Sequence, residues 1–405
     1  MMWEKEVHIP EIFKHLGYIL PIVFVLTYFL VSSPFFLYSM FFIFVIYGIN
    51  YYNLQTIHNK IRLIDKKKTI RLFPNEMATI PVVIKHKGII PLTQGHISFQ
   101  CSDTIKCLNT SSSIEGNNRS IYKFPISYQY KSMKSYSIEI LAKKRGTANL
   151  QNLELKAIDP FYISYSSLLY KYKFRTEVIV FPEPKQIANV NMLTKMKGGD
   201  YVTHHSLFED TSLIRGAREY TVNDPFSRVH WGLSAKNNTL MTKEFDKTTY
   251  VKWTIILNVL LDHPSSWSFS SKFEDYISYA TYMCQYAHKF DIPFEMYSNV
   301  VMNYNQSQFH IETGKGKTHL LKSMEMLSRI SPGGFSINLL PFYTSLKRKL
   351  DQDGIIIYIG NQGDKTVNFL SSQNQSGTTI FTVDVTDDSA NLKPFTMSAR
   401  RGSFA

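Results

Sequence analysis

The sequence is poor in cysteine, and this scarcity excludes two classes of protein. Only Cys101, Cys107 and Cys284 occur among its 405 residues. Three thiols cannot build the dense disulfide framework of a small secreted domain, and there is no Cys-x-x-Cys pair to hold zinc. Because 44% of the residues are hydrophobic and only 19% are charged, a disordered chain is also excluded. We therefore expect a folded protein of two or three domains in a reducing compartment.

Charge is missing from one long stretch, since no Asp, Glu, Lys or Arg occurs from Leu16 to Asn59. A Ser-Ser-Pro break divides this region into Ile12–Val31 and Phe35–Tyr52, each close to the ~20 apolar residues needed to cross a bilayer. A signal peptide would need a basic start and a small-residue cleavage site, and both are missing. The sequence therefore predicts a transmembrane helical hairpin over residues 1–59.

The basic residues next to this region predict its orientation. They follow the second apolar segment and include the cluster Lys66, Lys67 and Lys68, whereas the turn between the segments has none. The positive-inside rule predicts a multi-pass protein of the cell membrane with both termini and the remaining domains in the cytoplasm. The lysine cluster would meet anionic headgroups of the lipid bilayer, and Trp3 would anchor the chain at the interface. The net charge of +13 comes without a basic–aromatic module, so no nucleic-acid partner is expected.

Beyond residue 59 the hydrophobic pattern changes to a period of two. Ile138 and Ile140, for example, alternate with Ser137 and Glu139. Several short runs of this kind, separated by turn residues, are typical of an antiparallel β-sandwich. We place this domain at residues 60–182, with a basic start next to the apolar region.

The C-terminal part, residues 251–405, has a different pattern. Its continuous apolar runs are typical of strands buried on both faces, and they are Trp253–Leu261, Gly354–Gly360 and Thr378–Asp384. Apolar residues at helical spacing predict helices over Phe273–Phe290, Thr318–Ile330 and Leu339–Leu350. Strands that alternate with helices predict an α/β domain with a doubly wound parallel sheet.

The segment between these two domains, residues 183–250, holds the most distinctive motif. It contains Arg218-Glu219-Tyr220, Asp224-Pro225, Arg228, His230-Trp231 and Ser234-Ala235-Lys236. This pattern resembles the defining motif of the domain-of-unknown-function 58 family, with Asn223 in place of the usual Gly and Lys236 in place of the usual Arg. Lys144-Arg145-Gly146 and Asp159-Pro160-Phe161 also resemble family elements.

The resemblance implies a von Willebrand factor A-like fold for the C-terminal domain. It also implies partnership with a MoxR-type AAA+ ATPase, and often with a transglutaminase-like membrane protein. The residues themselves allow two interpretations that can both hold. Asp224 can pair with an arginine and lock a loop above Trp231, or the motif can be a docking surface, since Arg and Trp are favoured interface anchors. The predicted interaction residues are Arg218, Tyr220, Asp224, Arg228, His230, Trp231, Ser234 and Lys236.

The family's metal site, an Asp-x-Ser-x-Ser sequence, is degenerate in this chain. The matching positions are Asp262, Pro264 and Ser266, and the third predicted strand ends at Asn361 without an acidic residue. Too few oxygen ligands remain for a hard divalent cation, so we expect no metal and no other cofactor. The segment 313–318 lacks the first glycine of a phosphate loop and is interpreted as a loop before a helix.

Three functions are compatible with these features. The leading hypothesis is a non-enzymatic integral membrane protein that presents a cytoplasmic interaction module to a MoxR-type ATPase during protein assembly or activation. No catalytic residue is then expected. The first alternative is a hydrolase that uses Asp224 and His230, and a strongly shifted pKa in a closed pocket would favour it. The second is a metal-dependent adhesion module, which would need a complete metal site.

Overall fold

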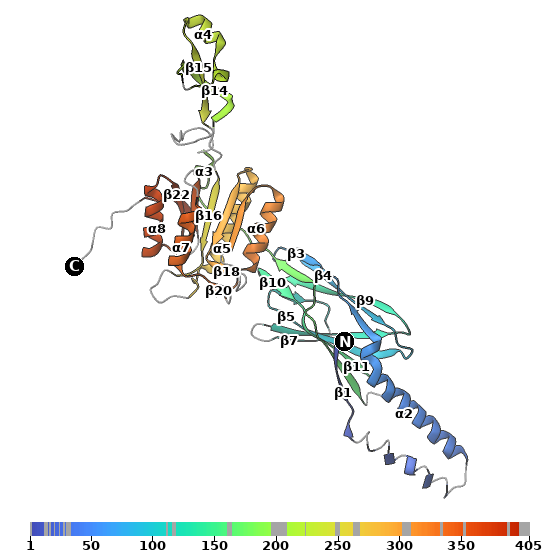
Figure 1. Cartoon of the computed structure of the whole chain (residues 1–405). Coiled ribbons are helices and arrows are strands. Elements are labelled where there is room, and N and C mark those ends of the chain that lie inside the picture. The colour runs from blue at the N-terminus through green and yellow to red at the C-terminus, as the bar shows by residue number, and fades with distance from the viewer. Residues whose placement is uncertain are drawn as a thin grey trace, which may run out of the picture. The chain divides into compact units, whose positions relative to one another are not determined.

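The computed structural model describes residues 2–396 except 12–14, 16–17, 20, 24, 27–28, 30–33, 111, 116–118, 160–163, 196–208, 223, 248–251, 262–267, 302–308, 333–334, 351–353 and 387–388. The chain divides into two compact units, Met1–Glu183 and Pro184–Ala405 (Figure 1). Each unit has its own sheets, and the described residues form one hydrophobic core in the first unit and two in the second, so each unit is described by itself.

The N-terminal unit is built on three sheets. The largest has the order β1 (Trp3–His8), β12 (Tyr165–Tyr170), β11 (Gln151–Ile158), β5 (Leu92–Ser102), β8 (Arg119–Tyr128) and β7 (Ser112–Glu115). The second has the order β2 (Ile61–Ile64), β4 (Met77–His86), β9 (Met133–Ala142) and β6 (Ile105–Cys107). The third has the order β10 (Gly146–Asn149), β13 (Glu177–Val180) and β3 (Thr69–Leu72).

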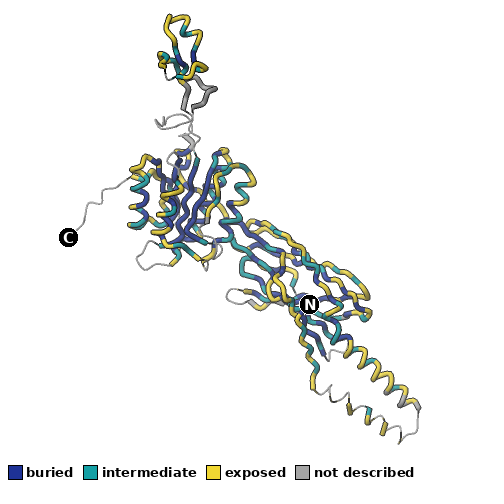
Figure 2. Tube along the Cα trace, in the orientation of Figure 1, coloured by how far each residue is buried: buried dark blue, intermediate teal, exposed yellow. Residues whose placement is uncertain are grey.

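One core lies between these sheets, and the alternation of side chains explains it. Ile97, Phe99 and Cys101 of β5 are buried at every second position, and so are Ile138 and Ile140 of β9. All of them belong to a single apolar cluster that draws on each of the three sheets. Period-two hydrophobicity turns one face of a strand toward the core, and in β9 the opposite positions are exposed or only partly buried. Figure 2 shows buried segments of these strands in the interior of the unit.

Among the described side chains of helix α2 (Pro34–Lys60), the buried ones lie in its C-terminal part. Leu54 and Ile57 are buried, and the Lys5 ammonium donates to the Gln55 side chain at 2.7 Å. Trp3 is buried as well, and its indole N–H donates to the Ile61 carbonyl at 2.9 Å. The prediction that Trp3 anchors the chain at a bilayer interface is therefore wrong, because the ring belongs to the protein core.

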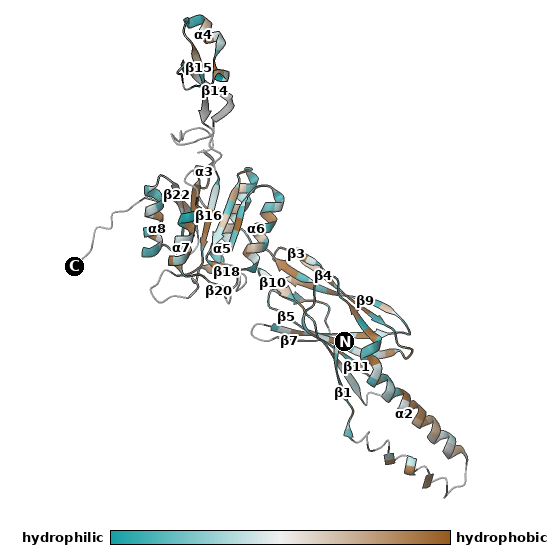
Figure 3. Cartoon of the chain, in the orientation of Figure 1, coloured by the Kyte–Doolittle hydropathy of each residue, from teal (hydrophilic) through white to brown (hydrophobic). Residues whose placement is uncertain are grey.

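The predicted transmembrane hairpin is also corrected. None of the helices in the described residues is both long enough and apolar enough to span a bilayer. Most of the first predicted segment, Ile12–Val31, lies outside the described residues. The second falls in α2, which is apolar over most of its length and more polar toward its C-terminal end, as the colours of Figure 3 show. The structure therefore does not support a membrane-spanning fold. It also does not support a location in the cell membrane with cytoplasmic termini, or the lipid bilayer as a partner.

The C-terminal unit contains a six-stranded sheet. Its order is β19 (Phe309–Gly314), β17 (Phe294–Ser298), β16 (Trp253–Asn258), β21 (Ile355–Gly360), β22 (Thr379–Val385) and β23 (Ala390–Pro394). The four central strands are parallel, and β19 and β23 are antiparallel edges. A short antiparallel pair, β18 (Val300–Val301) and β20 (Phe335–Ser336), lies outside this sheet.

Helices cover both faces of the sheet (Figure 1). One core gathers α3 (Asn191–Lys195), α5 (Phe273–Lys289) and α6 (Lys317–Arg329), and the other gathers α7 (Leu339–Lys349) and α8 (Asp364–Gln375). Successive residues of β16 alternate between the two cores, with Ile255 and Leu257 in the first and Ile256 in the second. This double burial explains why the central strands have continuous apolar sequences.

Candidate functional site

The motif segment forms an antiparallel hairpin with a structured insertion. Its strands are β14 (Glu209–Glu219) and β15 (Met241–Lys247), with Glu219 opposite Met241 and Arg218 opposite Thr242. The insertion contains a short 3₁₀ helix, η2 (Phe226–Arg228), and helix α4 (Trp231–Asn237). Bonds between backbone groups fix its base, since Tyr220 N donates to Leu240 O and His230 N donates to Met241 O, both at 2.8 Å.

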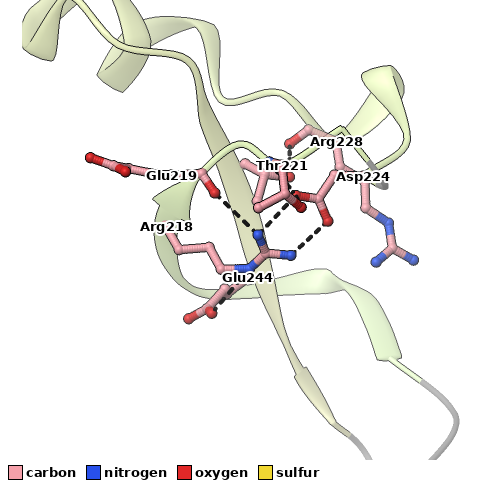
Figure 4. A network of polar contacts seen from close by, with 7 residues as sticks. Arg218, Glu219, Thr221, Asp224, Arg228 and Glu244 are labelled. Carbon is pink, nitrogen blue, oxygen red and sulfur yellow. Dashed lines mark hydrogen bonds and ion pairs between the residues drawn. The ribbon is translucent and has the colours of Figure 1, made fainter.

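A bidentate ion pair holds the loop that enters the insertion. The Arg218 guanidinium donates to both oxygens of Asp224, at 2.8 Å from Nη1 and 2.6 Å from Nη2 (Figure 4). Its Nε lies 3.7 Å from the Glu244 carboxylate of the opposite strand. The predicted pairing of Asp224 with an arginine is thus present, and two parallel N–H···O bonds fix its geometry.

Thr221 completes this carboxylate clamp. Both its backbone N–H and its hydroxyl donate to Asp224 Oδ2, at 2.9 and 2.8 Å. The Asp224 N–H donates back to the Thr221 carbonyl at 2.9 Å, so the turn is closed on itself. The Arg218 guanidinium and then the Thr221 donors hold the pKa of the Asp224 carboxyl well below its usual range. A carboxylate that stays ionised in this way is poorly suited to act as a general base near neutral pH.

His230 and Ser234 join helix α4 to strand β15. The His230 Nδ1 accepts from the Leu233 N–H at 3.3 Å, which caps the N-terminus of α4. The Ser234 hydroxyl donates to the His230 carbonyl and accepts from the Met241 N–H, both at 2.9 Å. Asp224 and His230 share no hydrogen bond in the described structure, so the pair proposed for a hydrolase is not assembled.

The outer face of the insertion is apolar and exposed. Trp231 is 62% exposed and Phe226 is 61% exposed, and their rings meet edge to face with centroids 5.4 Å apart. The ring of Tyr220, which is partly buried, also meets Phe226 edge to face, with centroids 6.3 Å apart, and Val222 is 96% exposed. We call Tyr220, Val222, Phe226 and Trp231 the aromatic surface. The prediction that Trp231 packs beneath the loop is wrong, because its ring lies on the outside.

The remaining predicted residues are spread over the chain. Arg228 lies at the end of η2 and is partly buried, and Lys236 is exposed in the last turn of α4. Lys66, Lys67 and Lys68 are exposed in the connection between β2 and β3. The degenerate metal site at Asp262, Pro264 and Ser266 lies outside the described residues. Among the described residues no group of three or more His, Cys, Asp or Glu could hold a metal ion.

The sequence interpretation missed Thr221, Val222 and Phe226. The spacing Thr221-x-x-Asp224, in which a hydroxyl meets a carboxylate three residues later, was a usable signal for the closed turn. Phe226 carries no such signal, since an aromatic residue in a short irregular segment is compatible with a buried or an exposed position.

Comparisons with known proteins add little. No protein-family model and no curated protein matches the chain, so the resemblance to the domain-of-unknown-function 58 family receives no support from them. Solved structures that resemble part of it include the cohesin CaCohA2 from Clostridium acetobutylicum, with 12% identity, 30% of this chain and 90% of that chain covered, and a TM-score of 0.19. Another is a non-cellulosomal cohesin from Archaeoglobus fulgidus, with 13% identity, 30% and 91% covered, and a TM-score of 0.18.

A third is the PapD-like domain 7 of human CEP192, with 10% identity, 30% of this chain and 84% of that chain covered, and a TM-score of 0.19. At scores this low, these likenesses carry no argument about the fold or the function.

Proposed function

We propose that this chain is a non-enzymatic interaction protein that captures a partner protein on the aromatic surface. The exposure of Trp231 and Phe226, two large rings in contact on the outside of a hydrogen-bonded insertion, is the observation that carries the proposal. Large aromatic side chains on a protein surface are the residues that most often dominate protein–protein binding. Apolar rings gathered outside the core are better explained by a partner than by packing.

The frame beneath the surface supports the same function. The clamp of Arg218, Thr221 and Asp224 and the bridge through Ser234 fix the positions of the rings before binding. A surface that is already ordered loses less conformational entropy when a partner binds. The motif is therefore suited to recognition by a fixed shape rather than by a flexible linker.

The resemblance of the motif supports a MoxR-type AAA+ ATPase as the partner, and a role in assembling or activating other proteins.

The hydrogen bonding of the Asp224 carboxylate supports a non-enzymatic role. Its carboxylate accepts four hydrogen bonds from Arg218 and Thr221, and none of the described histidines is hydrogen-bonded to it. The clamp thus resembles a structural element more than a catalytic one.

Site-specific photo-crosslinking tests the proposed surface. A photo-reactive amino acid replaces Val222, which is 96% exposed, in the full chain, and the purified ATPase is added. We expect a crosslinked product that disappears when unlabelled chain competes. The control position is Ile89, which is 75% exposed in the N-terminal unit and should give no product. Equal crosslinking at both positions, or none at Val222, would show that the partner does not bind this surface.

A further inference from the structure

One end of the four-stranded sheet in the N-terminal unit is strongly basic. Arg62 of β2 and Lys85 of β4 are directly opposite each other in their antiparallel pair. Lys60 ends helix α2 just before β2, and its carbonyl accepts from the Lys87 N–H at 2.8 Å. Lys131 N donates to the carbonyl of the residue that follows Lys87, at 3.3 Å. We call Lys60, Arg62, Lys85, Lys87 and Lys131 the basic patch.

The strand pattern explains why Arg62 and Lys85 face outward together. Arg62 lies between the buried Ile61 and Leu63, and Lys85 lies between two buried residues of β4. Both side chains are exposed, as are those of Lys87 and Lys131. Like charges directly opposite each other on neighbouring strands destabilise a sheet. The stability of the fold therefore gives no reason for this pair.

The chain supplies no acidic counterpart to the basic patch. No Asp or Glu occurs at 34–64, 77–102 or 119–138, the segments that contain the patch together with strands β2, β4, β5 and β8. The Lys60 ammonium donates to the neutral Asn53 side chain at 3.4 Å, and burial lowers its pKa. Residues 1–183 hold 22 Lys and Arg against 12 Asp and Glu, so this unit carries most of the formal charge of +13. The excess charge is available to a negatively charged ligand.

The aromatic rings at the patch favour a polypeptide over a nucleic acid. Lys60 Nζ lies over the Tyr52 ring, 5.2 Å from its centroid, and Lys131 Nζ lies over the Tyr130 ring at 5.0 Å. Single-stranded nucleic acids bind by stacking their bases on open aromatic faces, and here an ammonium group already occupies one face of each ring. Met133, which is opposite Lys85 in β9 and exposed, adds apolar surface beside the charges.

We propose that the basic patch is a docking surface for an acidic segment of a partner polypeptide, distinct from the ATPase proposed for the aromatic surface. Aspartate and glutamate carboxylates would accept hydrogen bonds from the Arg62 guanidinium and the neighbouring ammonium groups. They would also offset the repulsion between Arg62 and Lys85, which gives charge complementarity a double effect. Since the patch is exposed, this attraction is screened by salt.

Binding of a defined acidic peptide to the full chain tests the proposal. The probe is a fluorescein-labelled oligo-glutamate peptide, followed by fluorescence anisotropy, and a labelled oligo-glutamine peptide is the uncharged control. We expect only the glutamate peptide to bind, and to bind less tightly as salt is added. Arg62→Gln combined with Lys85→Gln should weaken binding about tenfold, which corresponds to about 1.4 kcal/mol for two charge contacts.

Lys106→Gln combined with Lys143→Gln is the matched control. It removes the same charge from exposed positions at the other end of the sheet, since Lys106 is opposite Leu141 near the end of β9, whereas Lys85 is opposite Met133 at its start. We expect its affinity to stay within about twofold of the unmodified chain. Neither double variant should lower the melting temperature, because all four substituted side chains are exposed.

Four results would overturn the proposal. The unmodified chain could fail to bind oligo-glutamate, or both double variants could lose affinity equally, which would assign the binding to net charge alone. Unfolding of the Arg62 and Lys85 variant would show that this pair is structural. Tighter binding of a single-stranded oligonucleotide or of phosphatidylserine vesicles, lost in that variant, would assign the patch to another class of ligand. None of these results depends on whether the aromatic surface binds an ATPase, because every substituted residue lies in Met1–Glu183.

Discussion

The Asp224 carboxylate allows a prediction for a single ionisable group. The donors of Arg218 and Thr221 lower its pKa in the folded chain, so its titration midpoint should lie below the ordinary aspartate value of about 3.9. Because the folded pKa is the lower one, the clamp stabilises the loop fully above the unfolded value. It stops doing so as the pH falls through the folded value. Carbon-13 carboxylate titration of aspartate-labelled protein measures the midpoint.

Arg218→Ala should bring this midpoint back toward the ordinary value. Arg228→Ala is the matched control, since Arg228 is not among the groups that shift the Asp224 pKa. An unshifted midpoint in the unmodified chain, or equal effects of the two substitutions, would refute the clamp.

At the residue scale, two tryptophans are expected to contribute very differently to the free energy of unfolding. Trp231 is exposed and Trp253 is fully buried in β16. Trp231→Ala should lower the free energy of unfolding by about 1 kcal/mol or less, since the ring is exposed and meets the Phe226 ring edge to face. Trp253→Ala should lower it by about 3–5 kcal/mol, because it leaves a cavity in a packed core. Urea denaturation of both variants provides the comparison, and similar losses would contradict the exposed position of Trp231.

At the scale of elements, the Ser234 hydroxyl adds a side-chain link between helix α4 and strand β15 to the backbone bond from His230 to Met241. Ser234 bridges the His230 carbonyl and the Met241 N–H. Ser234→Ala should weaken this junction by about 1 kcal/mol, the usual net value of one hydrogen bond, and the Met241 amide should exchange about fivefold faster. Ser227→Ala, at an exposed position in η2, serves as the control. Unchanged exchange in Ser234→Ala would show that the junction is held by other contacts.

The elements also show what local sequence can predict. The predicted strand Trp253–Leu261 matches β16, and the predicted helix Phe273–Phe290 matches α5. Both could be predicted because the residues that become buried form a recognisable pattern within the element itself. Helix α8 was missed, since it buries only Thr366, Phe369 and Leu370 among polar neighbours. Strand β1 was missed for another reason. Its partner β12 lies far away in the sequence, and a pairing of that kind leaves no mark on a local pattern.

In the candidate site, too, one feature could be predicted from the sequence and another could not. The Arg218–Asp224 pair could be anticipated from the sequence, because the two opposite charges lie six positions apart around a turn. The outward position of Trp231 could not, since hydrophobicity alone does not say which face of a small element is covered. The same ambiguity caused the error at α2, where a charge-free run was interpreted as a bilayer crossing.

For the whole molecule, the separation of the cores predicts two unfolding transitions. The core of Met1–Glu183 shares no residue with those of Pro184–Ala405. Ile97→Ala should destabilise the first unit by about 2–5 kcal/mol and leave the second at its original midpoint. Leu257→Ala should do the reverse. Calorimetry of the full chain follows both transitions, and a parallel shift of both by either substitution would contradict independent cores.

The function proposed for the whole molecule rests on the aromatic surface, and a matched pair of phenylalanines tests it most directly. Phe226 is 61% exposed in the insertion, and Phe335 is 63% exposed in β20. Each is replaced by serine in the full chain, and the Kd for the purified MoxR-type ATPase is measured. We expect Phe226→Ser to weaken binding at least tenfold, the effect of losing about 1.4 kcal/mol, with no change for Phe335→Ser. Equal affinities for the two variants would contradict the account.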